Sequence, residues 1–168
     1  MLVEIRQPFG LSPYFTTCQF CTGPKSGSVT LKWEFYSSPM FPISVALLDT
    51  RSLGYPKLDP MNLLEVDDAL AARFAAIANA VCQAWPKFKG GGLWKAMHGE
   101  MQGFFEIRIS KGKTNYRFIC HPIQRGEQLL IVVAGAAKPR QTGLPESFYE
   151  DVKTVFAKAC RLENLPLQ

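Results

Sequence analysis

Long hydrophobic runs are absent from this sequence of 168 residues, and their absence bears on where the protein works. The longest apolar stretch, residues 129–137, is much shorter than the ~20 residues that a membrane-spanning helix needs. The first ten residues, MLVEIRQPFG, lack the basic start and the apolar core of a secretory signal peptide. We therefore expect a cytoplasmic protein with no membrane segment.

Histidine and paired cysteine are also scarce. The five cysteines are an odd number, which does not fit the disulfide framework of a small secreted protein. Cys18 and Cys21 form a single CxxC, and a structural zinc site there would have to recruit the distant His98 and His121 to reach four ligands. We therefore expect no metal and no cofactor, and we interpret the CxxC as reduced cysteines in an irregular segment.

The charge that the sequence carries is unevenly distributed. With 47% hydrophobic and 20% charged residues, the chain has the composition of one globular domain, which excludes a disordered or fibrous protein. The net charge is +5, yet residues 86–140 hold ten Lys and Arg against three acids, and the remainder is slightly acidic. This segment is predicted to face a polyanion such as RNA, the alternative being a solvated sheet face where basic residues cluster by chance.

The N-terminal half divides into an extension and the start of a domain. Residues 1–28 are rich in Pro, Gly, Ser and Thr and are interpreted as an irregular extension, so the domain is expected to span residues 29–168. Residues 29–36 alternate like a strand, whereas the apolar stretch 43–48 fits either a short helix or a strand. Apolar residues at spacings of three and four predict a helix over 67–85, which begins at Asp67 and Asp68 and is stopped by Pro86.

The C-terminal half predicts three strands and a helix. The runs GFFEIRIS, TNYRFICH and LLIVVAGAA are separated by turns at residues 111–113 and 124–126, as expected for antiparallel hairpins. A closing helix is predicted from Pro145 and Glu146 to Leu162. The fold class is therefore α+β, a small and mainly antiparallel sheet packed by a helix from its N-terminal side and a C-terminal helix.

Two arginines are predicted to lie side by side on one face of this sheet. Alternation places Glu106 and Arg108 opposite the apolar Phe105 and Ile107, and the hairpin brings Arg117 beside Arg108. Two neighbouring guanidinium groups repel unless an anion lies between them or a carboxylate neutralises one. The pair therefore predicts a phosphate site, the alternative being a structural ion pair between Glu106 and Arg117.

An ordered set of short motifs over residues 93–165 resembles the RelE/ParE superfamily of toxins, most closely its HigB-like, phage-derived branch. That branch has a Lys and Gly before a strand with Glu-Leu-Arg, then a Tyr-Arg strand, then an apolar strand followed by Lys and Gln-Thr-Pro. The matching positions here are Lys95 and Gly99, Glu106-Ile107-Arg108, Tyr116-Arg117, Lys138, Gln141, Thr142 and Pro145.

The resemblance implies a RelE-like fold and a metal-independent endoribonuclease that cleaves mRNA on the ribosome and is held inactive by a cognate antitoxin. Its catalytic residues would be Lys95, Arg108 and Arg117, with His98 or His121 as general acid or base. The RNA backbone would be bound by Lys111, Lys113, Lys138 and Arg140. The alternative is a non-catalytic binding module on the same fold, such as a ParE-like gyrase inhibitor or an inactive prophage protein.

Overall fold

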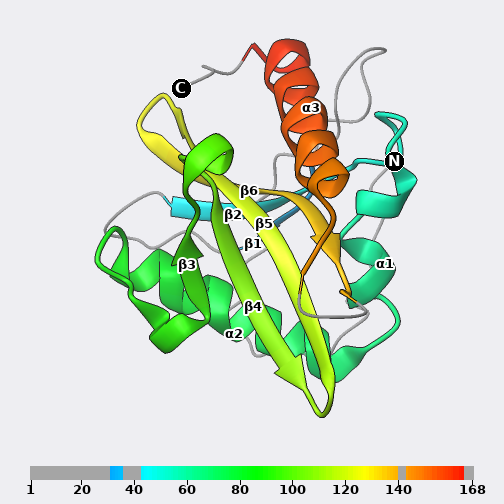
Figure 1. The fold of residues 1–168 in the computed structure, drawn as a ribbon. Helices are drawn as coiled ribbons and strands as arrows, with labels where there is room; N and C mark the ends of the chain where they lie inside the picture. Colours follow the sequence, from blue (N-terminus) through cyan, green and yellow to red (C-terminus); the bar gives the residue numbers. More distant parts are fainter. Residues whose placement is uncertain (1–30, 36–42, 140–142, 165–168) are drawn as a thin grey trace, which may run out of the picture.

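A computed structural model describes residues 31–35, 43–139 and 143–164 of the chain. They form an α+β fold around one sheet of six strands (Figure 1). The strands lie in the spatial order β1-β2-β6-β5-β4-β3. Their bounds are β1 Leu31–Phe35, β2 Ile43–Leu48, β3 Trp94–Ala96, β4 Phe105–Lys111, β5 Thr114–Arg125 and β6 Gln128–Ala137. The predicted extension, residues 1–28, lies outside the described residues.

The sheet is mainly antiparallel, as predicted, and β2 supplies its one parallel pairing among the described strands. β2 pairs with β6 in parallel, whereas β6, β5, β4 and β3 pair antiparallel in succession. All six residues of β2 are buried, which fits a strand covered on both faces. The stretch 43–48, for which the sequence allowed a helix or a strand, is therefore an interior strand next to β6. The short edge strand β3 has no counterpart among the predicted elements.

The predicted helix over 67–85 is present as α2, Asp68–Ala84. The Asp67 carboxylate accepts a hydrogen bond from the Leu70 backbone N–H, which caps the helix as the sequence predicts. A short helix α1, Met61–Leu64, precedes it. The apolar stripe of α2 packs on one face of the sheet, and this face is called the α2 face below.

The closing helix is α3, Glu146–Leu162, and it packs on the opposite face, called the α3 face. Figure 1 shows α3 across the upper part of the sheet and α2 behind the sheet. Phe148, Val152, Val155 and Ala159 are buried as predicted, whereas Leu162 is 46% exposed because the helix ends there. None of the described helices is both long and apolar enough to span a bilayer.

The approach of α3 to the sheet depends on Gly135 in β6. A Cβ at this position would lie 2.8 Å from Val152 Cγ2 of α3 and 3.7 Å from Leu58 Cβ. Gly135→Ala should therefore lower the free energy of unfolding by about 1–3 kcal/mol, measured by urea denaturation, because the packed helix must shift. Adding Val152→Ala should restore part of the loss. An unchanged free energy in Gly135→Ala would show that α3 adjusts without cost.

Candidate functional site

Four charged residues of β3, β4 and β5 meet on the α3 face. Arg108 of β4 stands opposite Arg117 of β5, and Lys95 of β3 stands opposite Glu106 of β4. All four share this face because strand residues alternate, and Ile107, between Glu106 and Arg108, is buried on the α2 face. The predicted register of the hairpin is confirmed. These residues, Lys95, Glu106, Arg108 and Arg117, are called the arginine site.

Glu106 lies between the two guanidinium groups. Its Oε1 accepts a hydrogen bond from Arg117 Nη1 at 2.9 Å, and its Oε2 accepts one from Arg108 Nε. The ion pair between Glu106 and Arg117, which the sequence allowed as the alternative to a phosphate site, is thus present, and it extends to Arg108. The side chain of Glu106 is 2% exposed, that of Arg117 is 18% exposed and that of Arg108 is 42% exposed. One carboxylate therefore neutralises one of the two positive charges and leaves the other partly accessible from solvent.

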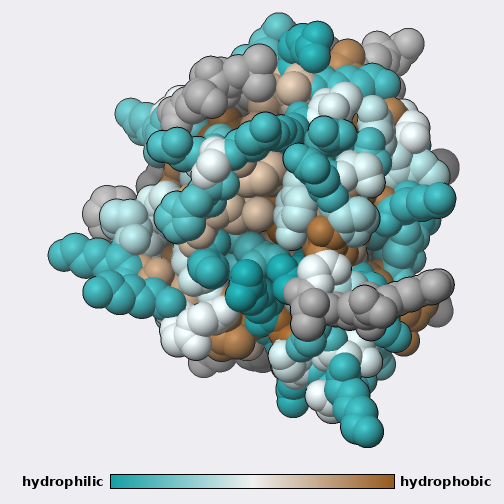
Figure 2. Space-filling model, in the orientation of Figure 1, coloured by the Kyte–Doolittle hydropathy of each residue, from teal (hydrophilic) through white to brown (hydrophobic). Residues whose placement is uncertain are grey.

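The arginine site lies on the α3 face next to the core under α3, and Arg108 is its more exposed arginine. In Figure 1, the lower parts of β4 and β5 continue past α3, and none of the described helices lies in front of them. Figure 2, in the same orientation, shows hydrophilic side chains gathered over these strands. Lys95 is exposed beside them, and its side chain makes no hydrogen bond or ion pair within the described ranges. With Lys95 counted, the site carries three positive charges and one negative charge, which suits a phosphate group.

Neither histidine lies at the arginine site. His98 is exposed three residues after Lys95, at the end of the sheet where β4 begins and away from Arg108. His121 is only 7% exposed and is held under α3, with Phe104 and Phe156 ring centroids 4.7 and 4.5 Å from its own. Its Nδ1 lies 2.8 Å from the Pro122 carbonyl oxygen. The described structure therefore separates both proposed proton-transfer groups from the arginines.

The buried position of His121 predicts a pH dependence of stability. Burial lowers the pKa of His121 from its ordinary value of 6.5, while the hydrogen bond to Pro122 opposes this shift. In the unfolded chain His121 takes up a proton near its ordinary pKa, whereas in the folded chain it does so only at lower pH. The free energy of unfolding should therefore fall as the pH drops below about 6.5. The slope attributable to one proton is at most about 1.4 kcal/mol per pH unit. Urea denaturation between pH 7.5 and 5.5, as order-of-magnitude settings, would measure it.

A matched pair of variants isolates this effect. His121→Phe should remove the slope because phenylalanine fits between aromatic neighbours and does not titrate. His98→Gln should retain it, since His98 is exposed. Equal slopes in the wild type and His121→Phe would assign the pH dependence to other groups.

Three of the four predicted RNA-backbone residues lie in the described part of the chain, near the hairpin turn and the end of β6. Lys111 Nζ lies 2.7 Å from both carboxylate oxygens of Asp67, whose pKa this contact lowers, so Lys111 stabilises the start of α2. Lys113 is exposed in the hairpin turn between β4 and β5. Lys138 Nζ lies 6.0 Å from the centre of the Tyr116 ring, beyond the end of β6. Arg140 lies outside the described residues, and the structure does not place it.

The described cysteines are buried free thiols. Burial raises the pKa of Cys82 to about 12 and also raises the pKa values of Cys120 and Cys160, so all three stay protonated at neutral pH. No group of three or more potential metal ligands occurs among the described residues. Cys18 and Cys21, predicted to be reduced, lie outside the described part of the chain.

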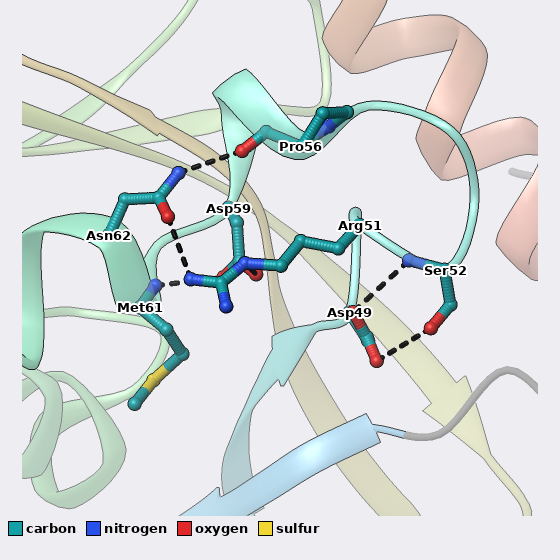
Figure 3. Close-up of polar contacts among 7 residues, drawn as sticks. All are labelled: Asp49, Arg51, Ser52, Pro56, Asp59, Met61 and Asn62. Carbon is teal, nitrogen blue, oxygen red and sulfur yellow. Dashed lines mark hydrogen bonds and ion pairs between the residues drawn. The ribbon is translucent and has the colours of Figure 1, made fainter.

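A second polar cluster, which the sequence did not reveal, occupies the connection between β2 and α1 (Figure 3). Arg51 Nε lies 2.6 Å from Asp59 Oδ2, and Arg51 Nη2 donates a hydrogen bond of 2.7 Å to Asn62 Oδ1. Asn62 Nδ2 donates to the Pro56 carbonyl oxygen at 2.7 Å, and Asp59 Oδ1 accepts from the Met61 backbone N–H at 2.9 Å.

These contacts fold the connection onto itself. Their charged and amide groups bind one another and the local backbone, and Asp49 accepts hydrogen bonds from Ser52 in the same loop. The connection places Leu58 against Gly135 of β6. The cluster therefore has a structural role, because it holds the connection against β6. The arginine site is the better candidate for binding a ligand.

Comparisons with protein-family models, with curated proteins and with solved structures found no match to this chain. A proposal about function therefore depends on the residues of the chain and their arrangement. The strongest observation is the arginine site on the α3 face, with its partly exposed Arg108.

Proposed function

We propose that this chain is a toxin of the RelE/ParE type, with a RelE-like fold, that binds mRNA through the arginine site and cleaves it on the ribosome in the cytoplasm. One observation carries this proposal: two arginines and a lysine gather around a single buried carboxylate on the α3 face, and Arg108 and Lys95 remain accessible to solvent in the described structure. The mainly antiparallel sheet with helices on opposite faces is compatible with this proposal. A cognate antitoxin would bind the same face and block it.

The chemistry of RNA cleavage explains what such a site can contribute. The 2′-oxygen attacks the adjacent phosphorus, the bond to the 5′-oxygen breaks, and a proton passes from the 2′-hydroxyl to the leaving oxygen by way of solvent or a general acid and base. A guanidinium group binds two phosphoryl oxygens at once and stabilises the charge that develops on them. Arg108 is best placed for this, because it is the more exposed arginine and Glu106 fixes its position. Lys95 would hold the neighbouring phosphate.

A non-catalytic binding module on the same fold is the second candidate. The separation of His98 and His121 from the arginines favours it, because no histidine in the described ranges is placed to transfer a proton at the arginine site. In this case the arginine site would bind a nucleic acid or an acidic protein without cleaving it.

Induced expression in a bacterium, followed by mapping of mRNA 5′ ends, distinguishes the two candidates. The endonuclease predicts new ends that recur at defined codon positions and disappear when translation is stopped. Growth arrest with DNA damage and without new mRNA ends would indicate a gyrase inhibitor. The absence of both effects from a folded, expressed protein would contradict the toxin proposal altogether.

The charge of the arginine site also predicts the salt dependence of binding. Each phosphate neutralised on single-stranded RNA contributes a slope of about −0.7 in a plot of log affinity against log salt concentration. Contacts from Lys95, Arg108 and Arg117 with two or three phosphates should therefore give a slope between about −1.4 and −2. Fluorescence anisotropy of a labelled oligonucleotide over about 50–200 mM salt measures it. A flat plot would remove electrostatic attraction as the basis of binding.

A further inference from the structure

Aromatic rings gather at the edge of the sheet, where β3 meets the end of α2. The Trp94 and Phe105 rings are stacked, with centroids 4.7 Å apart and planes inclined by 10°. Trp85, directly after α2, meets both rings edge-on at centroid distances of 6.4 and 5.7 Å. Trp94 is buried, whereas Trp85, Phe88 and Phe105 are only half-buried. The cluster thus holds a tryptophan ring in a fixed position that solvent still reaches.

The stretch of chain that carries most of this cluster has charge of one sign. Residues 69–99 contain no Asp or Glu. Lys87, Lys89 and Lys95 are exposed in this stretch, and their side chains form no hydrogen bond or ion pair with any residue that the structure describes. A face that serves only solubility usually mixes both signs. Half-buried aromatic rings beside unneutralised lysines are instead the combination that binds single-stranded nucleic acid, with bases on the rings and phosphates on the lysines.

The cluster is continuous with the arginine site around the edge of the sheet. Lys95 stands opposite Glu106 on the α3 face, and its neighbour Trp94 stands opposite Ile107 on the α2 face. The Leu93 carbonyl accepts a hydrogen bond from the Arg108 N–H at 2.9 Å, which fixes β3 against the arginine strand. An RNA molecule with a phosphate bound at Arg108 therefore has to cross only β3, the edge strand of the sheet, for one of its bases to reach Trp85.

We propose that Trp85, supported by Trp94 and Phe105 and flanked by Lys87 and Lys89, is a stacking site for an unpaired base of the RNA strand that the arginine site binds. This stacking site rests on the proposed function, because the same strand occupies both places. The ligand is single-stranded, since base pairing in a duplex hides the faces that stack on an aromatic ring.

Binding of two matched oligonucleotides tests the stacking site. Both are labelled 2′-O-methyl octamers, which cannot be cleaved because they lack the attacking hydroxyl; one carries adenines and the other has abasic sites at its central positions. Trp85→Leu should weaken binding of the adenine octamer about 5- to 150-fold, the range expected for one stacked base. The abasic octamer should bind the wild type and Trp85→Leu equally. Trp85→Phe should retain most of the affinity for adenine.

The outcomes separate this inference from the proposed function. Equal binding of both octamers by the wild type would overturn stacking, even if mRNA cleavage in cells is found. Adenine-dependent binding without cleavage would support stacking and contradict the nuclease. Self-association that Trp85→Leu abolishes, with no effect on either octamer, would overturn stacking in favour of a dimer contact. Near-ultraviolet circular dichroism establishes that each variant is folded.

Discussion

Arg108→Ala is expected to lower the rate of mRNA cleavage by about 10²- to 10³-fold while leaving the fold intact, because loss of a preorganised donor to a developing oxyanion has this size. The side chain of Arg108 is 42% exposed, and Glu106 keeps its contact with Arg117 when Arg108 is removed. The change in the free energy of unfolding should stay within about 1 kcal/mol, as for other partly exposed ion pairs. Growth inhibition after induced expression reports the loss of activity. Urea denaturation of the purified variant measures the free energy of unfolding.

Two further variants sharpen this expectation. Arg108→Lys keeps the positive charge but cannot make the proposed bidentate contact with a phosphate. Its activity should therefore lie between those of the wild type and Arg108→Ala. Arg125→Ala removes an arginine from the same sheet, at the turn between β5 and β6, and should retain full activity. Retained cleavage in a folded Arg108→Ala variant would show that this arginine has no part in the reaction.

The elements with strong local signals could be predicted from the sequence. The stripe of α2 and its cap at Asp67, and the hairpin around Gly112, depend on residues that are close in the chain. The pairing of β2 with β6 joins residues 43–47 to residues 129–133, and no short pattern encodes so distant a partner. Edge strand β3 has only three residues, too few for alternation to be recognised.

At the candidate site, too, the sequence predicts local strand geometry but not which distant elements pack on it. Alternation along the hairpin placed Glu106, Arg108 and Arg117 on one face and His121 on the same side of β5 as Arg117, as the structure has them. Alternation does not show which part of that face a helix covers, so the burial of His121 under α3 could not be foreseen. The contact between Lys111 and Asp67 likewise joins residues 44 positions apart.

Glu106→Ala is expected to have the largest effect on stability of any single change at the arginine site. The carboxylate is 2% exposed and contacts both arginines, so its loss removes the negative charge that separates Arg108 from Arg117. Removing one member of a buried ion cluster costs about 3–5 kcal/mol, which corresponds to a fall in Tm of roughly 6–20 °C for a domain of this size. Urea and thermal denaturation measure both quantities.

The matched control is Glu100→Ala, which removes a glutamate from an exposed ion pair with Lys153 at a distance of 2.9 Å and should leave stability nearly unchanged. The double variant Glu106→Leu with Arg117→Leu should recover much of the lost stability, because replacing both members of a buried pair by apolar side chains avoids an uncompensated charge. A stable Glu106→Ala variant would mean that solvent or another group neutralises the arginines. Instability in Glu106→Ala together with recovery in the double variant would instead assign Glu106 the role of holding Arg108 and Arg117 side by side, the arrangement on which phosphate binding depends.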